Sequence, residues 1–310
     1  MSSILTNTAA MTALKSLQAT NQAMETAQSR ISTGLDVAEA ADNAAYWSIA
    51  TTMRSDNSAL ATVQDALGLG AAKIDIAYTA TNSAIEVVDE IKSKLVAARE
   101  PGVDRTKIQS ELTELQAQLR SIADSASFSG ENWLSVDSGS TNYQAEKSIV
   151  SSFSRADDGS VSVATIEVDT TGIELIDIDD ESGILDTEYT TANGATPAVN
   201  VVYSVLTLDI TLPTVDDTVV DAMISHVDSA LLNMTTSASD LGAYKSRIEM
   251  QANFVSSLMD AIERGIGQLV DADMSEESTR LQALQVQQQL GVQALSIANG
   301  NAQIILSLFQ

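Results

Sequence analysis

The last thirty residues, from Leu281 to Gln310, contain no charged side chain. Some of them recur at alternating spacings of three and four, which is typical of a helix in a coiled coil. This row, the C-terminal seam, consists of Leu281, Leu284, Gln288, Gly291, Leu295, Ala298, Ala302, Ile305 and Phe309. Leu290 and Ile297 lie off the seam, so the helix is apolar on more than one face and must be buried on more than one face. Copies of the same chain are the simplest way to surround it.

A second row with the same spacing lies near the other end of the chain. This N-terminal seam consists of Ala10, Leu14, Leu17, Asn21, Met24, Gln28 and Ile31. Polar residues within a seam, here Asn21 and Gln28, tend to set the register of helix pairing at a cost in stability. Gly34 interrupts the pattern. An ordinary amphipathic helix is the other interpretation of this segment.

Three further helices follow from periodicity. One covers about 56–99 and ends at Glu100-Pro101-Gly102, because proline disfavours helix in the residue before it. Asp104 can cap the next helix, and a short turn between two such helices makes an antiparallel hairpin. After Asp216 the helical period returns, and apolar residues at three-four spacing from Val227 to Leu269 predict a long third helix, with one gap near Lys245.

The segment from about 135 to 215 lacks the helical period and contains alternating apolar and polar residues instead. Val161 and Val163 alternate with serine, which is typical of a strand. Alternation continues over 199–205 and then over 206–212 in the opposite phase, which predicts a β-bulge or a strand that changes face. Acidic residues are dense here, and the only basic ones between 130 and 230 are Lys147 and Arg155. A small acidic β domain is the favoured interpretation, with disorder as the alternative.

Charge and composition exclude several functional classes. The 42 acidic and 16 basic side chains give a net charge of −26, which argues against nucleic acid or an anionic membrane as a partner. There is no cysteine, and His226 is the only histidine. Disulfides, thiol catalysis and multi-histidine metal sites are therefore not expected. We expect no catalytic, cofactor-binding or metal-binding residues, and a protein that is not an enzyme.

Three local patterns have candidate chemistry, and each has a simpler interpretation. The glycine-rich run 68–73 lacks the spacing of a phosphate-binding loop, so helix packing is favoured. The acidic run 177–181 lacks the ligand order of a calcium loop and reads as a solvated face. Asn233-Met234-Thr235 matches a glycosylation sequon but lies within the long helix.

The start of the chain lacks the basic stretch and long apolar stretch of a secretory signal peptide. No run of about 18 apolar residues is present that could span a bilayer. We expect a cytoplasmic protein, or one exported by a route that needs no such signal.

Both ends carry short motifs. At the N-terminal end they are Ser2-Ser3-Ile4-Leu5-Thr6-Asn7, Arg30-Ile31-Ser32-Thr33-Gly34, Ala41-Asp42-Asn43-Ala44-Ala45 and Ser127-Phe128-Ser129-Gly130. At the C-terminal end they are Asp240-Leu241-Gly242-Ala243, Asp271-Ala272-Asp273, Ala298-Asn299 and Ile305-Leu306-Ser307-Leu308. Over about 1–135 and 218–310 the chain resembles the bacterial flagellins. The segment Tyr46-Trp47-Ser48-Ile49-Ala50 departs from the commonest sequence of the family at this place and resembles flagellins of the α-proteobacterial type.

The resemblance implies a mainly α fold in which long coiled-coil-like helices from both chain ends form a helical core, with a small acidic β-rich outer domain inserted in the middle. Residues 1–40 with 275–310 would line the inner tube of a filament, and 41–135 with 218–274 would form the next shell. Residues 136–217 would be a variable, surface-exposed domain. The implied assembly residues are Leu14, Leu17, Met24, Ile31, Leu281, Leu284, Leu295, Ala298, Ala302, Ile305 and Phe309.

The function implied is that of a self-assembling subunit of the flagellar filament. The resemblance also implies export through the flagellar type III apparatus, an extracellular location, and an export chaperone, filament cap and hook-junction proteins as partners. A hook–filament junction protein is the alternative within the same family. An enzyme displayed on a filament and a soluble coiled-coil scaffold are further alternatives. Proteolytic flagellins carry HExxH in the middle region, which this chain lacks.

The resemblance also bears on recognition by an animal host. In flagellins of enteric bacteria an arginine and a leucine contact the animal Toll-like flagellin receptor. The resemblance places Glu90 at the arginine position and Lys94 at the leucine position, while Glu111 keeps the family's acidic contact. We therefore expect weak receptor activation. The other interpretation is that these are solvent-facing helix residues with no part in recognition.

Overall fold

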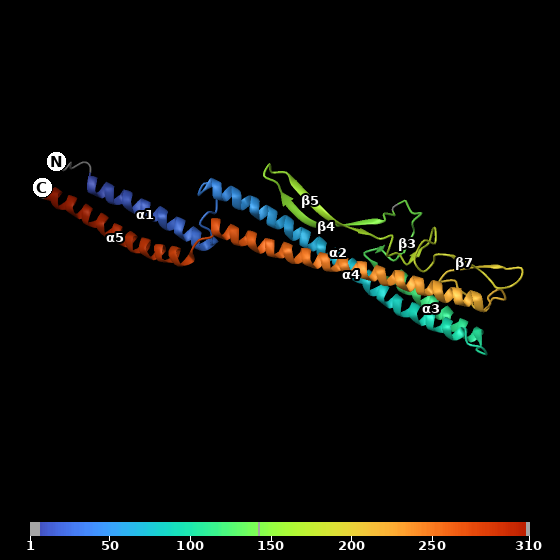
Figure 1. Cartoon of the computed structure of the whole chain (residues 1–310). Helices are drawn as coiled ribbons and strands as arrows, with labels where there is room; N and C mark the ends of the chain where they lie inside the picture. The colour runs from blue at the N-terminus through green and yellow to red at the C-terminus, as the bar shows by residue number, and fades with distance from the viewer. Residues whose placement is uncertain (1–6, 142, 308–310) are drawn as a thin grey trace. The chain divides into compact units, whose positions relative to one another are not determined.

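The structure is a computed structural model that describes residues 7–141 and 143–307, with side chains as far as Gly300. It is mainly helical, with a small strand-rich region in the middle of the chain, as predicted (Figure 1). The elements in chain order are α1 (Thr8–Thr33), α2 (Ala44–Ala98), α3 (Arg105–Ser125), β1 (Ser127–Phe128), β2 (Glu131–Asn132), β3 (Ser135–Val136), β4 (Glu146–Arg155), β5 (Val161–Asp169), β6 (Ile176–Asp177), β7 (Tyr189–Ala192), β8 (Asn200–Tyr203), α4 (Asp217–Val270) and α5 (Met274–Ser307).

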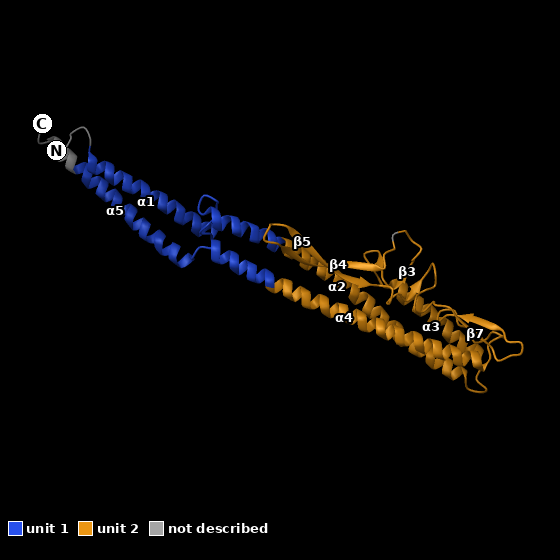
Figure 2. Ribbon diagram, turned by 45° about the horizontal axis from the view of Figure 1, so that its top comes forward, with its two compact units in different colours: residues 1–58, 258–310 blue, residues 59–257 orange. Residues whose placement is uncertain are grey.

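The chain divides into two compact units (Figure 2). Unit 1 consists of residues 1–58 and 258–310, and unit 2 of residues 59–257. Both boundaries fall inside long helices, because α2 and α4 each contribute residues to both units.

In unit 1, α1 and α5 lie side by side and run antiparallel (Figure 1). The side chain of Asn7 caps α1 by accepting a hydrogen bond from the Ala10 amide at 3.0 Å. At the other end Gly34 adopts a left-handed φ of 73° and donates its amide to the Arg30 carbonyl at 2.8 Å. Glycine takes this conformation without a steric penalty, so the predicted interruption at Gly34 is confirmed.

A small apolar cluster closes the other end of unit 1. Its buried members are Val37, Ala50, Ile266 and Val270. Backbone hydrogen bonds fasten the loop after α1 to the end of α4, since the Asp36 amide donates to the Val270 carbonyl at 2.8 Å. The loop is thereby held against the segment that leads into α5.

The long helices of unit 2 have buried faces that largely follow the predicted stripes. The buried side chains are Leu67, Ile74, Thr81, Val88, Ile91 and Leu95 on α2, Ile108, Leu112 and Leu119 on α3, and Val227, Met234, Leu241, Ile248 and Val255 on α4. The predicted turn at Pro101 and cap at Asp104 are confirmed, because the Asp104 carboxylate accepts the Thr106 amide at 3.0 Å. Both fit an antiparallel α2–α3 hairpin (Figure 1).

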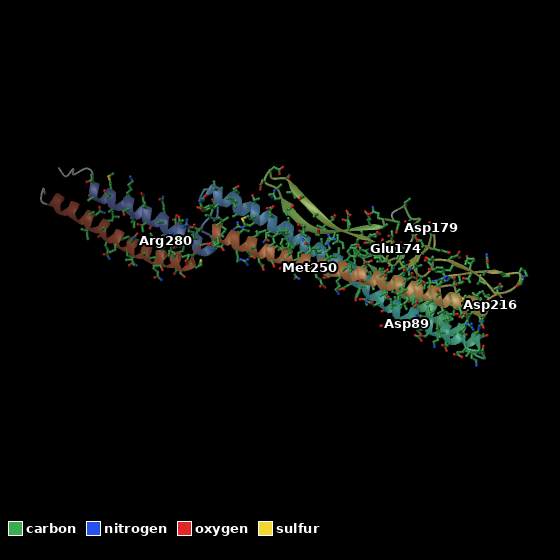
Figure 3. The ribbon with its side chains drawn as sticks, viewed as in Figure 1. Asp89, Glu174, Asp179, Asp216, Met250 and Arg280 are labelled. Carbon is green, nitrogen blue, oxygen red and sulfur yellow. The ribbon has the colours of Figure 1, made fainter. Side chains whose placement is uncertain are left out.

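One helix begins earlier than predicted. Helix α2 begins at Ala44 rather than near residue 56, because the Asn43 side chain accepts the amides of Ala45 and Tyr46 at 3.2 Å. Tyr46, Trp47 and Ile49 are exposed in the first turns, so no apolar stripe marks them. Helix α4 begins at Asp217, where Asp216 caps it (Figure 3), as the return of the helical period after Asp216 predicts. It continues through Lys245 without a break.

Among the described residues, the strands pair in four two-stranded sheets. The longest is the antiparallel β4–β5 ribbon, whose single irregularity lies between Val150 and Ser152. On β5 the buried residues are Ile166 and Val168, whereas Val161 and Val163 are exposed. Val161 and Val163 lie at the tip of the ribbon and face solvent rather than a core.

The predicted strand over 206–212 is wrong. Leu206, Leu208 and Ile210 are buried, yet the segment forms turns and contains no strand. Side chains of α3 satisfy its backbone in place of a neighbouring strand. Gln116 donates to the Leu208 carbonyl at 3.1 Å, and Gln109 accepts the Ile210 amide at 2.9 Å. Alternating burial here comes from turns packed on a helix, and the predicted bulge between 205 and 206 does not occur.

Candidate assembly site

The C-terminal seam faces α1. Its described members Leu281, Leu284, Gln288, Gly291, Leu295 and Ala298 are half-buried. The apolar residues between them are exposed, namely Val286, Leu290, Val292 and Ile297, and Ile297 reaches 67%. Helix α5 therefore buries one face within the chain and leaves a second apolar face uncovered. The side chains of Ala302 and Ile305, and the whole of Phe309, lie outside the described residues.

The N-terminal seam differs in part from the predicted one. Leu17, Asn21, Met24 and Ile31 are half-buried, as the spacing predicts. Leu14 is 46% exposed and Gln28 is also exposed, while Ala27 is buried. The face of α1 that meets α5 is rotated toward Ala27, because the shorter alanine side chain allows the two helices to approach.

Three polar or close contacts join the seams. The Gln288 amide donates to the Asn21 side-chain oxygen at 2.8 Å, and Asn7 donates to the Ala298 carbonyl at 2.9 Å. Gly291 lies against Leu17, where an added Cβ would be 3.2 Å from Leu17 Cδ1. These contacts fix which residues of α5 stand opposite which residues of α1.

A buried carboxylate lies at the beginning of α5. Only 6% of the Glu277 side chain is exposed, and its Oε1 accepts hydrogen bonds from Arg280 at 2.7 Å and from Arg30 of α1 at 3.2 Å. Arg30 also pairs with Asp36 at 2.6 Å. Figure 3 labels Arg280 on α5. Sequence reasoning missed this cluster, although Glu277 lies one helical turn before Leu281 of the seam.

Glu90, Lys94 and Glu111 come together on unit 2. All three line a groove of about 370 Å³ between α2 and α3. Lys94 Nζ lies 2.5 Å from a Glu111 carboxylate oxygen, and this hydrogen bond raises the pKa of Lys94 above its ordinary value. The acidic side chain at position 111 is thus already paired within the chain.

The other candidate patterns have structural roles. The run 68–73 is helical, and Lys73 pairs with Glu131 at 2.5 Å. Burial by itself would raise the pKa of Glu131, but hydrogen bonds from Lys73 and Lys147 lower it below the ordinary value. Asn233 is exposed on α4. Among the described residues, no group of acidic or histidine side chains is arranged to hold a metal ion.

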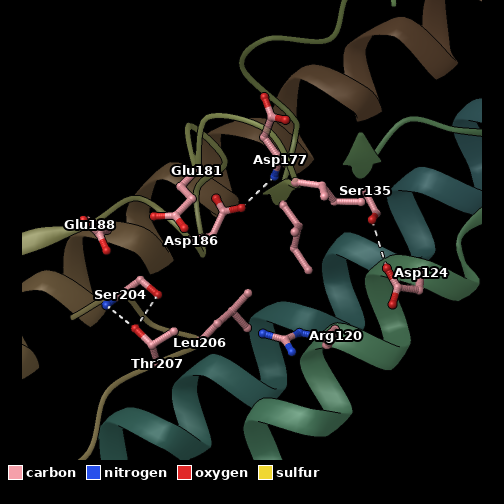
Figure 4. A pocket seen from close by; sticks show the side chains of 12 residues that line it. Arg120, Asp124, Ser135, Asp177, Glu181, Asp186, Glu188, Ser204, Leu206 and Thr207 are labelled. Atoms are coloured by element: carbon pink, nitrogen blue, oxygen red, sulfur yellow. Dashed lines mark hydrogen bonds between the residues drawn. The ribbon is translucent and has the colours of Figure 1, made fainter. Parts of the chain in front are cut away.

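The acidic run 177–181 borders a cavity of about 350 Å³ (Figure 4). Asp177 is buried, and hydrogen bonds from Ser138, Asp179 and Ser182 satisfy its carboxylate. Burial opposes this ionisation, yet the hydrogen bonds lower the pKa of Asp177 to about 2. The Asp177 carboxylate therefore stabilises the conformation of its own loop by accepting these hydrogen bonds.

His226 joins α4 to the β7–β8 hairpin. Its ring stacks on Tyr189 with centroids 4.1 Å apart, and its Nδ1 lies 2.6 Å from the Tyr203 hydroxyl. Burial lowers the pKa of His226 below its ordinary value of 6.5. With its proton on Nε2, the neutral ring accepts the hydrogen bond of the tyrosine hydroxyl, so the histidine has a packing role in this structure.

No helix within 7–141 and 143–307 is apolar over enough of its length to cross a membrane.

Comparison with known proteins identifies the family. The chain matches the bacterial flagellin N-terminal helical region over residues 4–138 and the bacterial flagellin C-terminal helical region over residues 224–309.

Curated relatives agree with the family match over their whole length. Flagellin C of Rhizobium meliloti strain 1021 is 53% identical, flagellin A of Rhizobium meliloti is 46% identical, and a flagellin of Brucella melitensis is 44% identical. Each alignment covers 100% of both chains. A crystal structure of Bacillus cereus flagellin aligns with 63% of this chain and 88% of that one at 15% identity, with a TM-score of 0.40 that is too low to bear on the fold. Two family matches at opposite ends and three full-length relatives show that the chain belongs to the bacterial flagellin family.

Proposed function

We propose that the α1–α5 pair builds the inner tube of a filament by burying its uncovered apolar face against other copies of the chain. The observation that carries this proposal is the exposed face of α5, where Val286, Leu290, Val292 and Ile297 are all more than half exposed. No charge occurs from Leu281 onward. Apolar surface of this kind is stable only when something covers it, and identical copies present the same surface.

Family membership gives the function in outline. Flagellins are the structural subunits of the flagellar filament, and this chain is a structural, self-polymerising protein rather than an enzyme. The relatives reported above are all named flagellin, and none of them favours a hook–filament junction protein.

The layered arrangement extends this proposal. Residues 1–40 with 275–310 form the tube, residues 41–135 with 218–274 form the shell around it, and residues 136–217 form the outer surface. The burial of one face of α2, α3 and α4 and the exposure of the β4–β5 tip support this order. The proposed location is extracellular, with an export chaperone, a filament cap and hook-junction proteins as further partners.

The groove that contains Glu90 supports a second proposal, that the chain activates the animal flagellin receptor weakly. Glu90 presents a negative charge where an arginine would attract the receptor, so attraction is replaced by repulsion. Lys94 places an ammonium group where an apolar contact would be buried, and it already holds Glu111.

The assembly proposal is tested by a charge on the uncovered face of α5. Ile297 is 67% exposed in a single chain, so Ile297→Asp costs little there. In the tube the same carboxylate would lose its water, which costs several kcal/mol. Val202→Asp on β8 is the matched control, because Val202 is 52% exposed and lies on the outer domain.

Assembly is measured by sedimentation and electron microscopy of purified protein. We expect Ile297→Asp to stay in the supernatant and Val202→Asp to form filaments. Leu295→Asp and Ile305→Asp are expected to behave like Ile297→Asp. Filaments of Ile297→Asp at the normal yield would contradict the proposal.

A further inference from the structure

The Ala272 amide donates to the Gly34 carbonyl at 2.9 Å and so anchors the start of α5 beside the end of α1. Along the two seams, however, apolar contact alone defines the register weakly. Apolar and small residues dominate both seams, and Leu284, Gly291 and Ala298 are spaced one heptad apart. Sliding α5 by seven residues would therefore still bring apolar or small side chains opposite Leu17. Hydrophobic contact is non-directional, so it distinguishes such registers weakly.

Charge distinguishes them more strongly. The charged residues of α1 are Lys15, Glu25 and Arg30, and those of α5 are Glu276, Glu277 and Arg280. Within the described residues, Arg30 with Glu277 is the only ion pair that joins these two helices. A slip of one heptad moves α5 by about 10 Å along its axis, which separates this pair completely.

Separation of the Arg30–Glu277 ion pair would destabilise the chain chiefly at Glu277, because this carboxylate is buried. Its side chain is 6% exposed, and its Oε2 is buried without a hydrogen-bond partner. A buried carboxylate that loses a cationic partner is strongly unfavourable, whereas a well-packed apolar residue would serve stability as well. Buried polar groups between helices are best established as determinants of register.

We infer that Glu277, held between Arg30 and Arg280, selects the register in which α1 pairs with α5. This inference rests on the proposed role of the pair in assembly, because a slipped subunit would present its apolar face at the wrong height in a helical lattice. Arg30 and Glu277 are positioning residues in this account. The Asn21–Gln288 hydrogen bond reinforces the same register.

The register can be read by cross-linking, since the natural chain has no cysteine. A Cβ at position 291 would lie 3.8 Å from Leu17 Cβ, which matches the separation in a disulfide. Leu17→Cys with Gly291→Cys therefore reports the native register. Leu17→Cys with Leu284→Cys and Leu17→Cys with Ala298→Cys report slips of one heptad in either direction.

Each cysteine pair is combined with Glu277→Gln and, separately, with Arg30→Gln. The matched control is Glu276→Gln, which removes an adjacent charge whose ion pair within the described residues is with Arg280 at 2.8 Å. Asp36→Asn controls for the second partner of Arg30. Oxidised full-length protein is separated into pellet and supernatant, and disulfides are identified by mass spectrometry.

We expect the 17–291 disulfide to dominate in the natural background and in both controls. In Glu277→Gln and Arg30→Gln the ratio of the native to the slipped disulfides should fall by at least about tenfold. An equal loss of all three disulfides would overturn the inference, because it would show stabilisation without selection of register. Unchanged ratios would overturn it as well.

The outcome is separable from that of the proposed function. A natural-background protein that forms the 17–291 disulfide but never pellets contradicts the assembly proposal and leaves the register readable in the soluble chain. Absence of the 17–291 disulfide from both fractions contradicts the register itself.

Discussion

Gly70 of α2 faces Ile149 of β4 so closely that a Cβ at position 70 would come within 2.5 Å of Ile149 Cγ2. Two further contacts fasten the same part of the ribbon. Gln251 of α4 donates to the Ser151 carbonyl at 3.0 Å, and Lys147 pairs with Glu131 at 3.1 Å. The β4–β5 ribbon therefore packs against the helices of unit 2. At position 70 only glycine leaves enough space for Ile149.

Gly70→Ala should destabilise unit 2 by about 1–3 kcal/mol, because the methyl group forces Ile149 or the strand to move. Gly68→Ala is the matched control, since a Cβ at position 68 meets nothing within 4 Å. In a helix that change should be neutral or should stabilise by up to about 1 kcal/mol. Urea unfolding measures both, and equal effects at the two positions would contradict the account of Gly70.

The helices were largely predictable from sequence because their buried faces repeat at a fixed period. Ile74, Ile91 and Leu95 are buried as that period requires. The start of α2 was missed because capping by Asn43 leaves no apolar stripe in the first turns. Capping is local polar chemistry that periodicity does not record.

The strand-rich character of the middle of the chain was predictable, but the positions of its strands were predicted only in part. Alternation marks both the exposed Val163 and the buried Leu208, because a period of two says nothing about whether a core lies beneath the strand. In the assembly site the spacing located the seam of α5. It did not locate Glu277, because contact with Arg30 depends on how two distant helices align.

The β4–β5 ribbon should be dispensable for filament formation. Its two ends are adjacent, since the Thr170 amide donates to the Ala145 carbonyl at 2.8 Å. Residues 146–169 can therefore be replaced by a short glycine linker. Electron microscopy of the variant should show filaments. Soluble, helical protein that forms none would show that the ribbon takes part in assembly.

His226 should make stability depend on pH. Because burial lowers its pKa below 6.5, the folded chain binds the proton more weakly than the unfolded chain. The stability that the neutral ring contributes is thus present above about pH 6.5 and is lost as the pH falls further. The free energy of unfolding should decline more steeply from about pH 7 to pH 5 than in His226→Gln, whose amide side chain is polar but does not titrate in that range. Parallel pH profiles would contradict this.

Activation of the receptor should increase when Glu90 and Lys94 in the groove between α2 and α3 are replaced by arginine and leucine. Glu90→Arg removes the repulsive charge, and Lys94→Leu restores an apolar side chain while releasing Glu111 from its 2.5 Å ion pair. A reporter-cell assay with depolymerised protein measures potency. The double variant should exceed the natural chain by about a hundredfold or more, which corresponds to a few kcal/mol. Natural protein as potent as an enteric flagellin would refute the proposal.

Hydrogen exchange of α5 in free and assembled protein tests the central claim most directly. In the free chain α5 buries only one face, so its amides over 281–300 should exchange rapidly. In the filament the uncovered face is buried by other copies, and exchange over the same residues should slow by several orders of magnitude. Slow exchange in the free chain, or no added protection in the filament, would contradict the claim that the paired terminal helices are completed by assembly.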